Sequence, residues 1–278
     1  MKHAGERWRV PPEGRISLNE IDPASTSEAP GDRATTEAAI PQLHERLFLL
    51  QDRLWAEARR SVLVVLQGMD AAGKDGTIKY VFKGVNPQGT RVAIFKEPTP
   101  EELSHDFLWR VHRSAPRAGE IGIFNRSHYE DVLIARVDRL VEKRVWMERY
   151  ELINAFERVL AHGGTTTIKL FLHISYEEQG RRLTKRLEDP DKRWKASRSD
   201  FTERARWDDY HAAYTEALER TSSDTAPWYV VPADHKWYRN WVVSRVLIET
   251  LEAMDPRYPE PPPLNAPGAE APLLSDPR

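Results

Sequence analysis

Apolar residues along the chain form short continuous runs that alternate with longer segments of helical spacing. The continuous runs are typical of strands buried on both faces, and they lie at 61–66, 91–95, 120–124, 167–174 and 228–231. Apolar residues three or four positions apart predict helices at 41–60, 75–83, 100–113, 142–161 and from the last strand to about 254. Strands separated by helices at this spacing indicate βαβ units and a parallel sheet.

The two ends of the chain lack this alternation. Residues 1–40 are rich in Pro, Ser, Thr and acidic residues. They predict an irregular N-terminal arm, which Trp8, Val10 and Ile16 would dock on the body. Residues 258–278 contain seven prolines, which predicts a disordered or loosely attached tail.

Between these ends we expect one domain, residues 41–257. Its segment 175–226 has no strand between its helices and contains the most basic stretch of the chain. Because ligands of open α/β sheets bind at the carboxyl ends of the strands, this segment predicts a helical lid over that edge.

Composition limits the kinds of partner. The net charge is −2 and the pI is near 6.5, whereas a protein that binds nucleic acid over its surface is usually basic, so any phosphate site must be local. The chain has no cysteine, which excludes disulfides and thiolate metal sites. No apolar run approaches the length of a membrane span, and the charged N-terminal residues without an apolar stretch predict that no secretory signal is present. A cytoplasmic protein without membrane or nucleic-acid partners is therefore expected.

A glycine-rich loop follows the first buried strand. The segment GMDAAGK at 68–74 matches the pattern G-x-x-x-x-G-K between a strand and a helix. Glycines let the backbone turn tightly and point its N–H groups inward, while the helix N-terminus and the lysine add positive charge. The loop therefore predicts phosphate binding by Met69, Ala71, Ala72, Gly73, Lys74, Asp75 and Gly76.

Two acids depart from the usual pattern of such loops. Asp75 occupies the position of the Ser or Thr that normally binds Mg²⁺, and Asp70 lies inside the loop. Because a carboxylate repels phosphate unless a cation bridges them, Asp70 and Asp75 are candidate ligands of Mg²⁺, with Mn²⁺ as a possible substitute. The alternative for Asp75 is a simple acidic residue in the first turn of the helix.

Polar residues crowd the end of the third strand, where a nucleotide is expected to bind at Asn125, Arg126, His128, Glu130 and Asp131. Arg126 suits bidentate contact with phosphate oxygens. Asn125 is neutral and can still hold a metal-bound water. For His128 a role in orienting its neighbours is favoured over catalysis. Glu130 and Asp131 are equally open to being helix-start acids without chemistry.

A basic segment, residues 181–195, lies within the predicted lid. It has seven basic and three acidic residues. Arg182, Lys185 and Arg186 are spaced to share one helix face, which suits a long polyanion laid along the sheet edge. The alternative is a solvated face paired with nearby acids, but a concentrated basic face beside a phosphate loop favours binding.

Five long motifs together carry a specific resemblance. They are GMDAAGKDGTIK at 68–79, FKEPTPEELSHDFLWRVH at 95–112, GIFNRSHYEDVL at 122–133, KRLEDPDKRWKASRSDFTERARWDDY at 185–210 and APWYVVPADHKWYRNWVVSRVL at 226–247. In this order they resemble the polyphosphate kinase 2 family over about residues 40 to 255. Many members have Asp where this chain has Asn125, and the FNRSHYEDVL form is similar to the subgroup that accepts both AMP and ADP.

The resemblance implies a three-layer α/β/α P-loop kinase fold, similar to thymidylate kinases, with a five-stranded, mostly parallel sheet and a helical lid. It implies reversible, Mg²⁺-dependent transfer of a terminal phosphoryl group from polyphosphate to AMP or ADP, with ATP among the nucleotides bound. Asp70, Lys74 and Arg126 are then expected to act in catalysis, and the basic residues of the lid to hold phosphates. The resemblance also favours a homo-oligomer, for which the helix at 142–161 is a candidate interface.

Two other functions fit parts of the pattern. An ATP-dependent nucleoside monophosphate kinase shares the loop, the sheet and the lid, but it needs neither an acid inside the loop nor so basic a lid. A non-catalytic module that binds RNA or polyphosphate fits the basic helix. The acids beside the loop disfavour such a module, because without metal they repel a polyanion.

Overall fold

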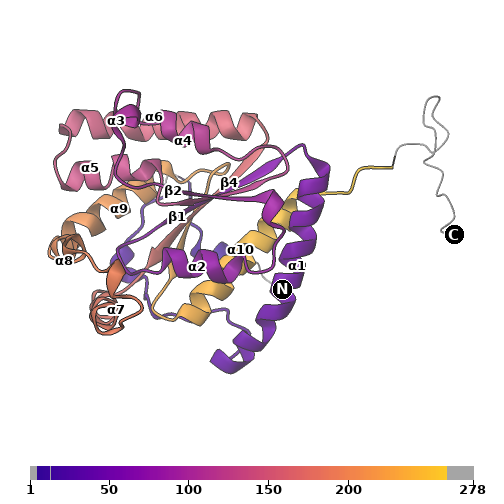
Figure 1. Ribbon diagram of the computed structural model, residues 1–278, viewed down its shortest axis with the longest axis horizontal. Coiled ribbons are helices and arrows are strands. Elements are labelled where there is room, and N and C mark those ends of the chain that lie inside the picture. Colours follow the sequence, from indigo (N-terminus) through magenta and orange to yellow (C-terminus); the bar gives the residue numbers. More distant parts are fainter. Residues whose placement is uncertain (1–4, 13, 262–278) are drawn as a thin grey trace.

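A computed structural model describes residues 5–12 and 14–261 and places a five-stranded parallel sheet at the centre of the protein (Figure 1). The strand order is β2-β3-β1-β4-β5, and every pair of neighbours is parallel. This confirms the predicted sheet. The strands are β1 (Ser61–Gln67), β2 (Thr90–Ile94), β3 (Ile121–Asn125), β4 (Thr165–His173) and β5 (Trp228–Pro232).

Helices cover both faces of the sheet and complete the three layers. One layer holds α1, α2 and α10, and the other holds α5, α6 and α9 (Figure 1). The helices are α1 (Arg33–Glu57), α2 (Lys74–Val81), α3 (Pro100–Leu103), α4 (Trp109–Ser114), α5 (Ile134–Val137), α6 (Lys143–His162), α7 (Tyr176–Glu188), α8 (Arg198–Arg204), α9 (Trp207–Thr221) and α10 (Lys236–Met254). Within the described ranges, no helix is both long and apolar enough to cross a bilayer.

The central strand explains where the site forms. All seven residues of β1 are buried, as its continuous apolar run predicts. Leu66 near its end pairs with Asn125 at the end of β3. Because the strands are parallel, the loop after β1 and the polar cluster after β3 begin side by side at the same edge of the sheet.

The N-terminal arm is shorter than predicted and is firmly packed. The Asp32 carboxylate accepts a hydrogen bond from the Thr35 amide at 2.8 Å, so α1 begins at Arg33, and the prediction of irregular structure up to residue 40 is wrong for its last eight residues. The predicted docking is confirmed: Trp8 and Val10 are buried, and the Trp8 indole donates to the Tyr238 hydroxyl at 3.0 Å.

The predicted helix at 100–113 is two short helices, α3 and α4. A capping box formed by Thr99 and Glu102 begins α3. The Asp106 carboxylate then accepts a hydrogen bond from the Leu108 amide, which stabilises the turn before α4. The 3.6-residue period of the apolar positions continues through this turn, so the sequence pattern does not reveal the break.

The predicted lid is also smaller than residues 175–226. Tyr210, Ala213 and Tyr214 of α9 are buried in the core, because α9 packs against α5 and α6. We therefore use the word lid for residues 176–206, which comprise α7, α8 and the turns around them, and their action as a lid stays a prediction. Most of the predicted C-terminal tail, residues 262–278, lies outside the described residues.

Candidate active site

The glycine-rich loop turns between β1 and α2 through backbone conformations that need glycine. Gly68 has φ +152° and Gly73 has φ +107°. A Cβ on Gly68 would lie 2.8 Å from the Leu172 carbonyl oxygen, and a Cβ on Gly73 would lie 2.0 Å from Nη1 of Arg239. The positive φ angles disfavour other residues at both positions, and at Gly68 the backbone oxygen also leaves no room for a Cβ.

Lys74, the first residue of α2, folds back across the loop. Its Nζ donates a hydrogen bond to the Gly68 carbonyl oxygen at 2.7 Å. Burial, together with the nearby Arg126 guanidinium, lowers the pKa of Lys74, whereas Asp70 opposes this shift. The Lys74 ammonium is thus bound to the loop backbone, and an anion bound by the loop would favour the charged form of this lysine.

Asp70 joins the loop to the end of β3. One of its carboxylate oxygens lies 3.1 Å from Nη2 of Arg126. Burial alone would raise the pKa of Asp70, but Lys74 and Arg126 hold it below its ordinary value. Ala71 and Arg126 have φ values near +61°. Such left-handed backbone at non-glycine residues costs free energy and is concentrated at functional sites.

Glu203 on α8 is a site residue that sequence reasoning missed. Its carboxyl is hydrogen-bonded to that of Asp70, and burial and this acidic neighbour raise the pKa of Glu203 to about 8. The two acids therefore share a proton near neutral pH. No sequence signal marks this residue, because an acid on a charged, exposed helix usually faces solvent.

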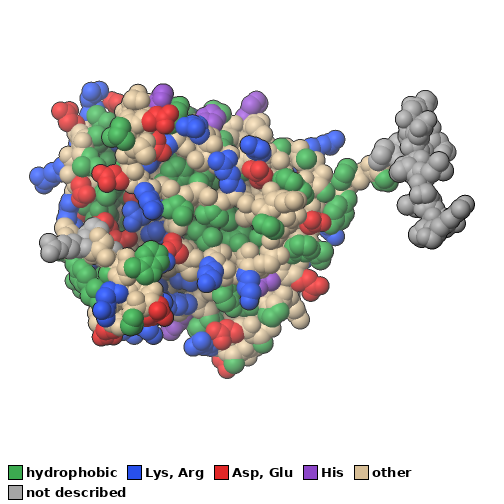
Figure 2. Space-filling view, viewed as in Figure 1, with side chains coloured by type: hydrophobic (Ala, Val, Ile, Leu, Met, Phe, Trp, Pro, Cys, Tyr) green, Lys and Arg blue, Asp and Glu red, His purple; other side chains and the backbone are tan. Residues whose placement is uncertain are grey.

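A small cavity above the loop brings these groups together. It is lined by the loop, the end of β3 and the lid, through Gly68, Met69, Asp70, Lys74, Arg126, Glu130, Ile134, Glu203, Tyr210 and Tyr214. Lys and Arg side chains gather around the hollow between α5 and α7 (Figure 2). The cavity therefore combines an amide-rich loop, two cations and several carboxyl groups, which is a set that can bind phosphate together with a divalent cation.

Asp75 connects the loop to two other segments. Its Oδ1 accepts a hydrogen bond from the Asn125 side-chain amide at 2.8 Å, and its Oδ2 lies 3.1 Å from Nζ of Lys195 in the lid. Gly73, not an acid, is the N-cap of α2. Asp75 therefore does more than occupy the first helical turn, since it ties together the loop, β3 and the lid.

The strand-end residues divide into two groups. Asn125, Arg126 and Glu130 face the loop, as the contacts and the cavity lining show. His128 is fully buried, with its Nε2 3.5 Å from the Glu157 carboxylate, and Asp131 pairs with Arg149 of α6 at 3.3 Å. The structural interpretation of His128 is therefore supported, since its fully buried ring cannot contact a nucleotide, and a nucleotide contact by Asp131 stays a prediction.

The predicted phosphate contact by Arg182 is also corrected. Its Nε donates to Glu178, its Nη1 to the carbonyl oxygens of Ala71 and Ala72, and its Nη2 to those of Ala233 and Asp234. All its N–H groups are thus engaged by protein acceptors, and those on Nη1 hold the phosphate loop. Helical spacing correctly places Arg182 on α7 but cannot show which partners its side chain meets.

The other two basic residues of this face are Lys185 and Arg186. Lys185 is exposed. Burial raises the pKa of Asp70, and the half-buried Arg186 helps Lys74 and Arg126 to bring it below its ordinary value. Direct phosphate binding by Lys185 and Arg186 stays a prediction.

A buried polar network supports the strand-end cluster from behind. Nζ of Lys169 on β4 lies 2.6 Å from the Glu157 carboxylate and 3.0 Å from the Tyr129 hydroxyl, and all three residues are buried. It also donates to the Thr221 carbonyl oxygen at 2.6 Å. The network therefore anchors the 3₁₀ helix His128–Asp131, which follows Arg126, to strands and helices of the core.

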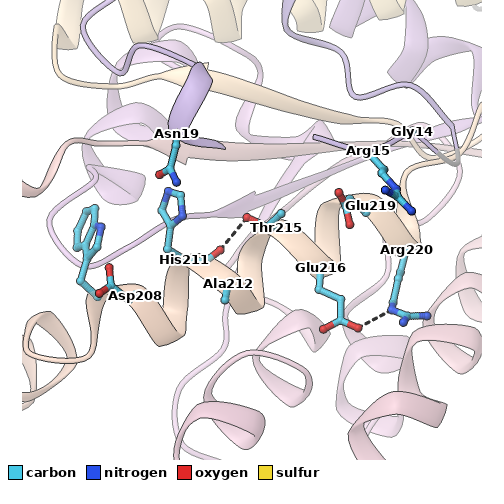
Figure 3. Close-up of a pocket in the computed structure, with 11 residues that line it drawn as sticks. Gly14, Arg15, Asn19, Asp208, His211, Ala212, Thr215, Glu216, Glu219 and Arg220 are labelled. Carbon is cyan, nitrogen blue, oxygen red and sulfur yellow. Dashed lines mark hydrogen bonds and ion pairs between the residues drawn. The ribbon is translucent and has the colours of Figure 1, made fainter. Parts of the chain in front are cut away.

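A larger hollow lies between α9 and the N-terminal arm (Figure 3). It is lined by Arg15, His211, Glu216 and Arg220, among others, and Glu216 and Arg220 are already paired at 2.7 Å. None of its lining residues belongs to the loop or the strand-end cluster. Size alone therefore does not identify the active site.

Comparison with known proteins finds a family and a solved structure that resemble this chain over most of its length. The sequence profile of the family described as polyphosphate kinase 2 matches residues 31–259. The chain is 54% identical to an AMP/ADP-polyphosphate phosphotransferase of Meiothermus ruber over 92% of this chain and 96% of that protein. It is 48% identical to an ADP-polyphosphate phosphotransferase of Rhodopseudomonas palustris over 78% and 79% of the two chains. The crystal structure of a polyphosphate kinase 2 from Arthrobacter aurescens superposes with a TM-score of 0.90 at 44% identity, covering 94% of this chain and 93% of that one.

Proposed function

Because the chain belongs to the polyphosphate kinase 2 family, we propose that it transfers the terminal phosphoryl group of inorganic polyphosphate to AMP and ADP. The observation that carries the proposal is the contact of Asp70 in the phosphate loop with Arg126 at the end of β3. This contact supports a phosphate site and a nucleotide site that adjoin. The high identity to an AMP/ADP-polyphosphate phosphotransferase over nearly the whole chain supports the choice of substrates.

The loop and Lys74 would hold the phosphate chain. Main-chain N–H groups at a helix N-terminus favour anions, and the Lys74 ammonium needs only to leave the Gly68 carbonyl oxygen to reach a phosphate above the loop. Lys185 and Arg186 of α7 would neutralise charge farther along the chain. Arg182 and Asp75 would keep the loop in place through the hydrogen bonds already described.

The residues present fit Mg²⁺ as the metal. Asp70 and Glu203 share a proton, an arrangement in which a divalent cation can take the place of that proton. Within the described residues, no three His, Asp or Glu side chains converge as a complete metal cage. Mg²⁺ is usually bound by one or two carboxylates together with substrate phosphates and water, so such a cage is not required. When bound, the ion would neutralise charge on the reacting phosphates.

The reaction exchanges one phosphoanhydride bond for another. A terminal oxygen of the nucleotide attacks the last phosphorus of polyphosphate, the bond to the next phosphate breaks, and the shortened chain leaves with the bonding electrons. The attacking oxygen is already ionised at neutral pH, so no strong base is needed, and catalysis consists of positioning and charge stabilisation. Arg126 would contact the transferring group, and closure of the lid would exclude water.

We further propose a homo-oligomeric, cytoplasmic enzyme. The outer face of α6 exposes Leu152 (50% exposed) and Val159 (59% exposed), two turns apart, which supports this helix as an interface. A cytoplasmic location fits the nucleotide substrates.

The test is a product analysis with purified protein. AMP or ADP is mixed with polyphosphate and Mg²⁺ in the absence of ATP, and the nucleotides are separated. We expect ADP and ATP to form from AMP, and ATP to form from ADP. Turnover of AMP only when ATP is added would instead identify an ATP-dependent monophosphate kinase. Salt-sensitive polyphosphate binding without turnover would identify a binding module.

A further inference from the structure

Arg239 on α10 is a buried cation directly behind the phosphate loop. Its side chain is 2% exposed. Its Nη1 donates to the Ala72 carbonyl oxygen at 3.1 Å, and its Nη2 and Nε donate to the side-chain oxygen of Asn240 at 2.9 and 3.2 Å. All these partners are neutral, so the guanidinium is hydrogen-bonded but not paired with a carboxylate.

The charges around Arg239 are positive. Within the described part of the chain, no Asp or Glu lies within ion-pair distance of it, and the charged group that acts on it most is Arg182, which has Glu178 as its own partner. Burial and the charge of Arg182 lower the pKa of Arg239 to about 9. Lys236, one turn earlier on α10, has a pKa lowered by burial and by the same two arginines. An uncompensated buried cation is costly in a folded protein.

The position of the guanidinium relates it to the phosphate site. A Cβ on Gly73 would lie 2.0 Å from Nη1 of Arg239, and a Cβ on Gly76 would lie 3.7 Å from its Nη2. The group therefore rests against the first turn of α2, where unpaired N–H groups already form a positive helix end. The Ala72 carbonyl oxygen also accepts a hydrogen bond from Arg182 at 3.0 Å, so it does not depend on Arg239 for a donor.

We propose that Arg239 is a positioning residue whose counter-ion is the phosphate chain: from behind the loop it supplies positive charge that no carboxylate offsets until the anion binds. This inference rests on the proposed function, because it requires the loop to bind polyphosphate. It differs from a purely structural role in its consequences. Loss of a structural arginine would lower the stability of the ligand-free protein and leave its affinity for phosphate unchanged. Loss of Arg239 would instead lower the affinity for phosphate and leave the stability of the ligand-free protein unchanged.

The experiment uses the full chain with Arg239→Met, Arg239→Lys and, as a matched control on the same helix, Arg245→Met. Arg245 pairs with Glu249 at 2.8 Å, and among the described residues it makes no hydrogen bond or ion pair with the loop. Binding of tripolyphosphate is measured by titration calorimetry, and the thermal midpoint is measured with and without it. Tripolyphosphate is the only ligand used.

We expect Arg239→Met to raise the Kd for tripolyphosphate about tenfold, the effect of losing one favourable charge interaction that acts across the loop. Its midpoint without ligand should equal or exceed that of the unmodified protein. Arg239→Lys, which keeps the charge, should bind within about threefold of the unmodified protein, and Arg245→Met should bind unchanged.

Three results would overturn the inference. They are an unchanged Kd in Arg239→Met, a failure of that variant to fold, and a tenfold loss of affinity in Arg239→Lys, which would assign the effect to hydrogen-bond geometry and not to charge. If the unmodified protein itself does not bind tripolyphosphate, the proposed function fails first, so the two failures are distinguishable.

Discussion

Nη2 of Arg126 lies 3.1 Å from Oδ1 of Asp70, and this contact joins two segments that are 56 residues apart in the chain. Each segment carries a residue in the left-handed region, Ala71 beside Asp70 and Arg126 itself. The backbone strain and the ion pair occur together where β1 and β3 end. Because oppositely charged side chains are already positioned in this site, they need to move little when a charged substrate binds.

Lys74→Met should lower the turnover of AMP with polyphosphate by about 100-fold or more, because it removes a positive charge positioned for the phosphates. The rate is measured at saturating polyphosphate, and the thermal midpoint confirms that the variant is folded. Lys79→Met, an exposed lysine of the same helix, is the matched control and should retain activity. Comparable rates for Lys74→Met and Lys79→Met would remove Lys74 from the chemistry.

Asp70→Asn should lower turnover to a similar extent and flatten the dependence of rate on Mg²⁺, because the amide is a poor metal ligand and cannot share a proton with Glu203. The measurement is a Mg²⁺ titration of the initial rate. Glu188→Gln, which changes an exposed acid of α7, should leave the titration unchanged. A normal Mg²⁺ profile in Asp70→Asn would reject a metal-binding role for this acid.

Removing one partner of the buried Lys169–Glu157 pair should be strongly destabilising. The Lys169 ammonium lies 2.6 Å from the Glu157 carboxylate, and both side chains are buried. Glu157→Gln leaves a buried cation unpaired, for which the expected loss is about 3–5 kcal/mol in the free energy of unfolding.

Urea denaturation measures this loss. The exposed Arg144–Glu148 pair on the same helix is the control, and Arg144→Ala should cost less than about 1 kcal/mol. The double change of Lys169 and Glu157 to Met should recover much of the stability lost in the single variant. Equal losses in Glu157→Gln and Arg144→Ala would contradict the importance of the buried pair.

His173 predicts a dependence of stability on pH. Burial lowers the pKa of this histidine from 6.5 to about 4, although its hydrogen bond to the Ile21 carbonyl oxygen opposes the shift. Because the folded-state pKa lies below the unfolded value, the folded protein favours the neutral ring. The stability that His173 contributes to the folded protein is present above pH 6.5 and is lost as the pH falls toward 4.

The gap between these pKa values corresponds to about 3 kcal/mol. Urea denaturation of the unmodified protein and of His173→Gln is compared across this pH range. His173→Gln should lose less stability on acidification, whereas His162→Gln, at an exposed position, should follow the unmodified protein. Parallel curves for the unmodified protein and His173→Gln would show that His173 does not control the acid response.

Local patterns were sufficient to predict much of this protein. A strand such as β1 is recognisable because burial on both faces demands a continuous apolar run, and the phosphate loop is recognisable because only glycine tolerates its backbone at Gly68 and Gly73. These requirements act on residues that are neighbours in the chain. The fold class, the succession of strands along the chain and the position of the candidate site therefore follow from the sequence.

Other features depend on which side chains meet across the fold. Arg182 and Arg186 belong to one basic helix, yet Arg182 is occupied by carbonyl oxygens of distant loops, which spacing along α7 cannot reveal. Glu203 reaches Asp70 only because the lid folds over the loop. The sequence by itself determined that a phosphate loop lies at the edge of a parallel sheet, since its steric and hydrophobic requirements are local. Only the tertiary structure decided which charges face that loop, because burial, pairing and shared protons depend on residues far apart in the chain.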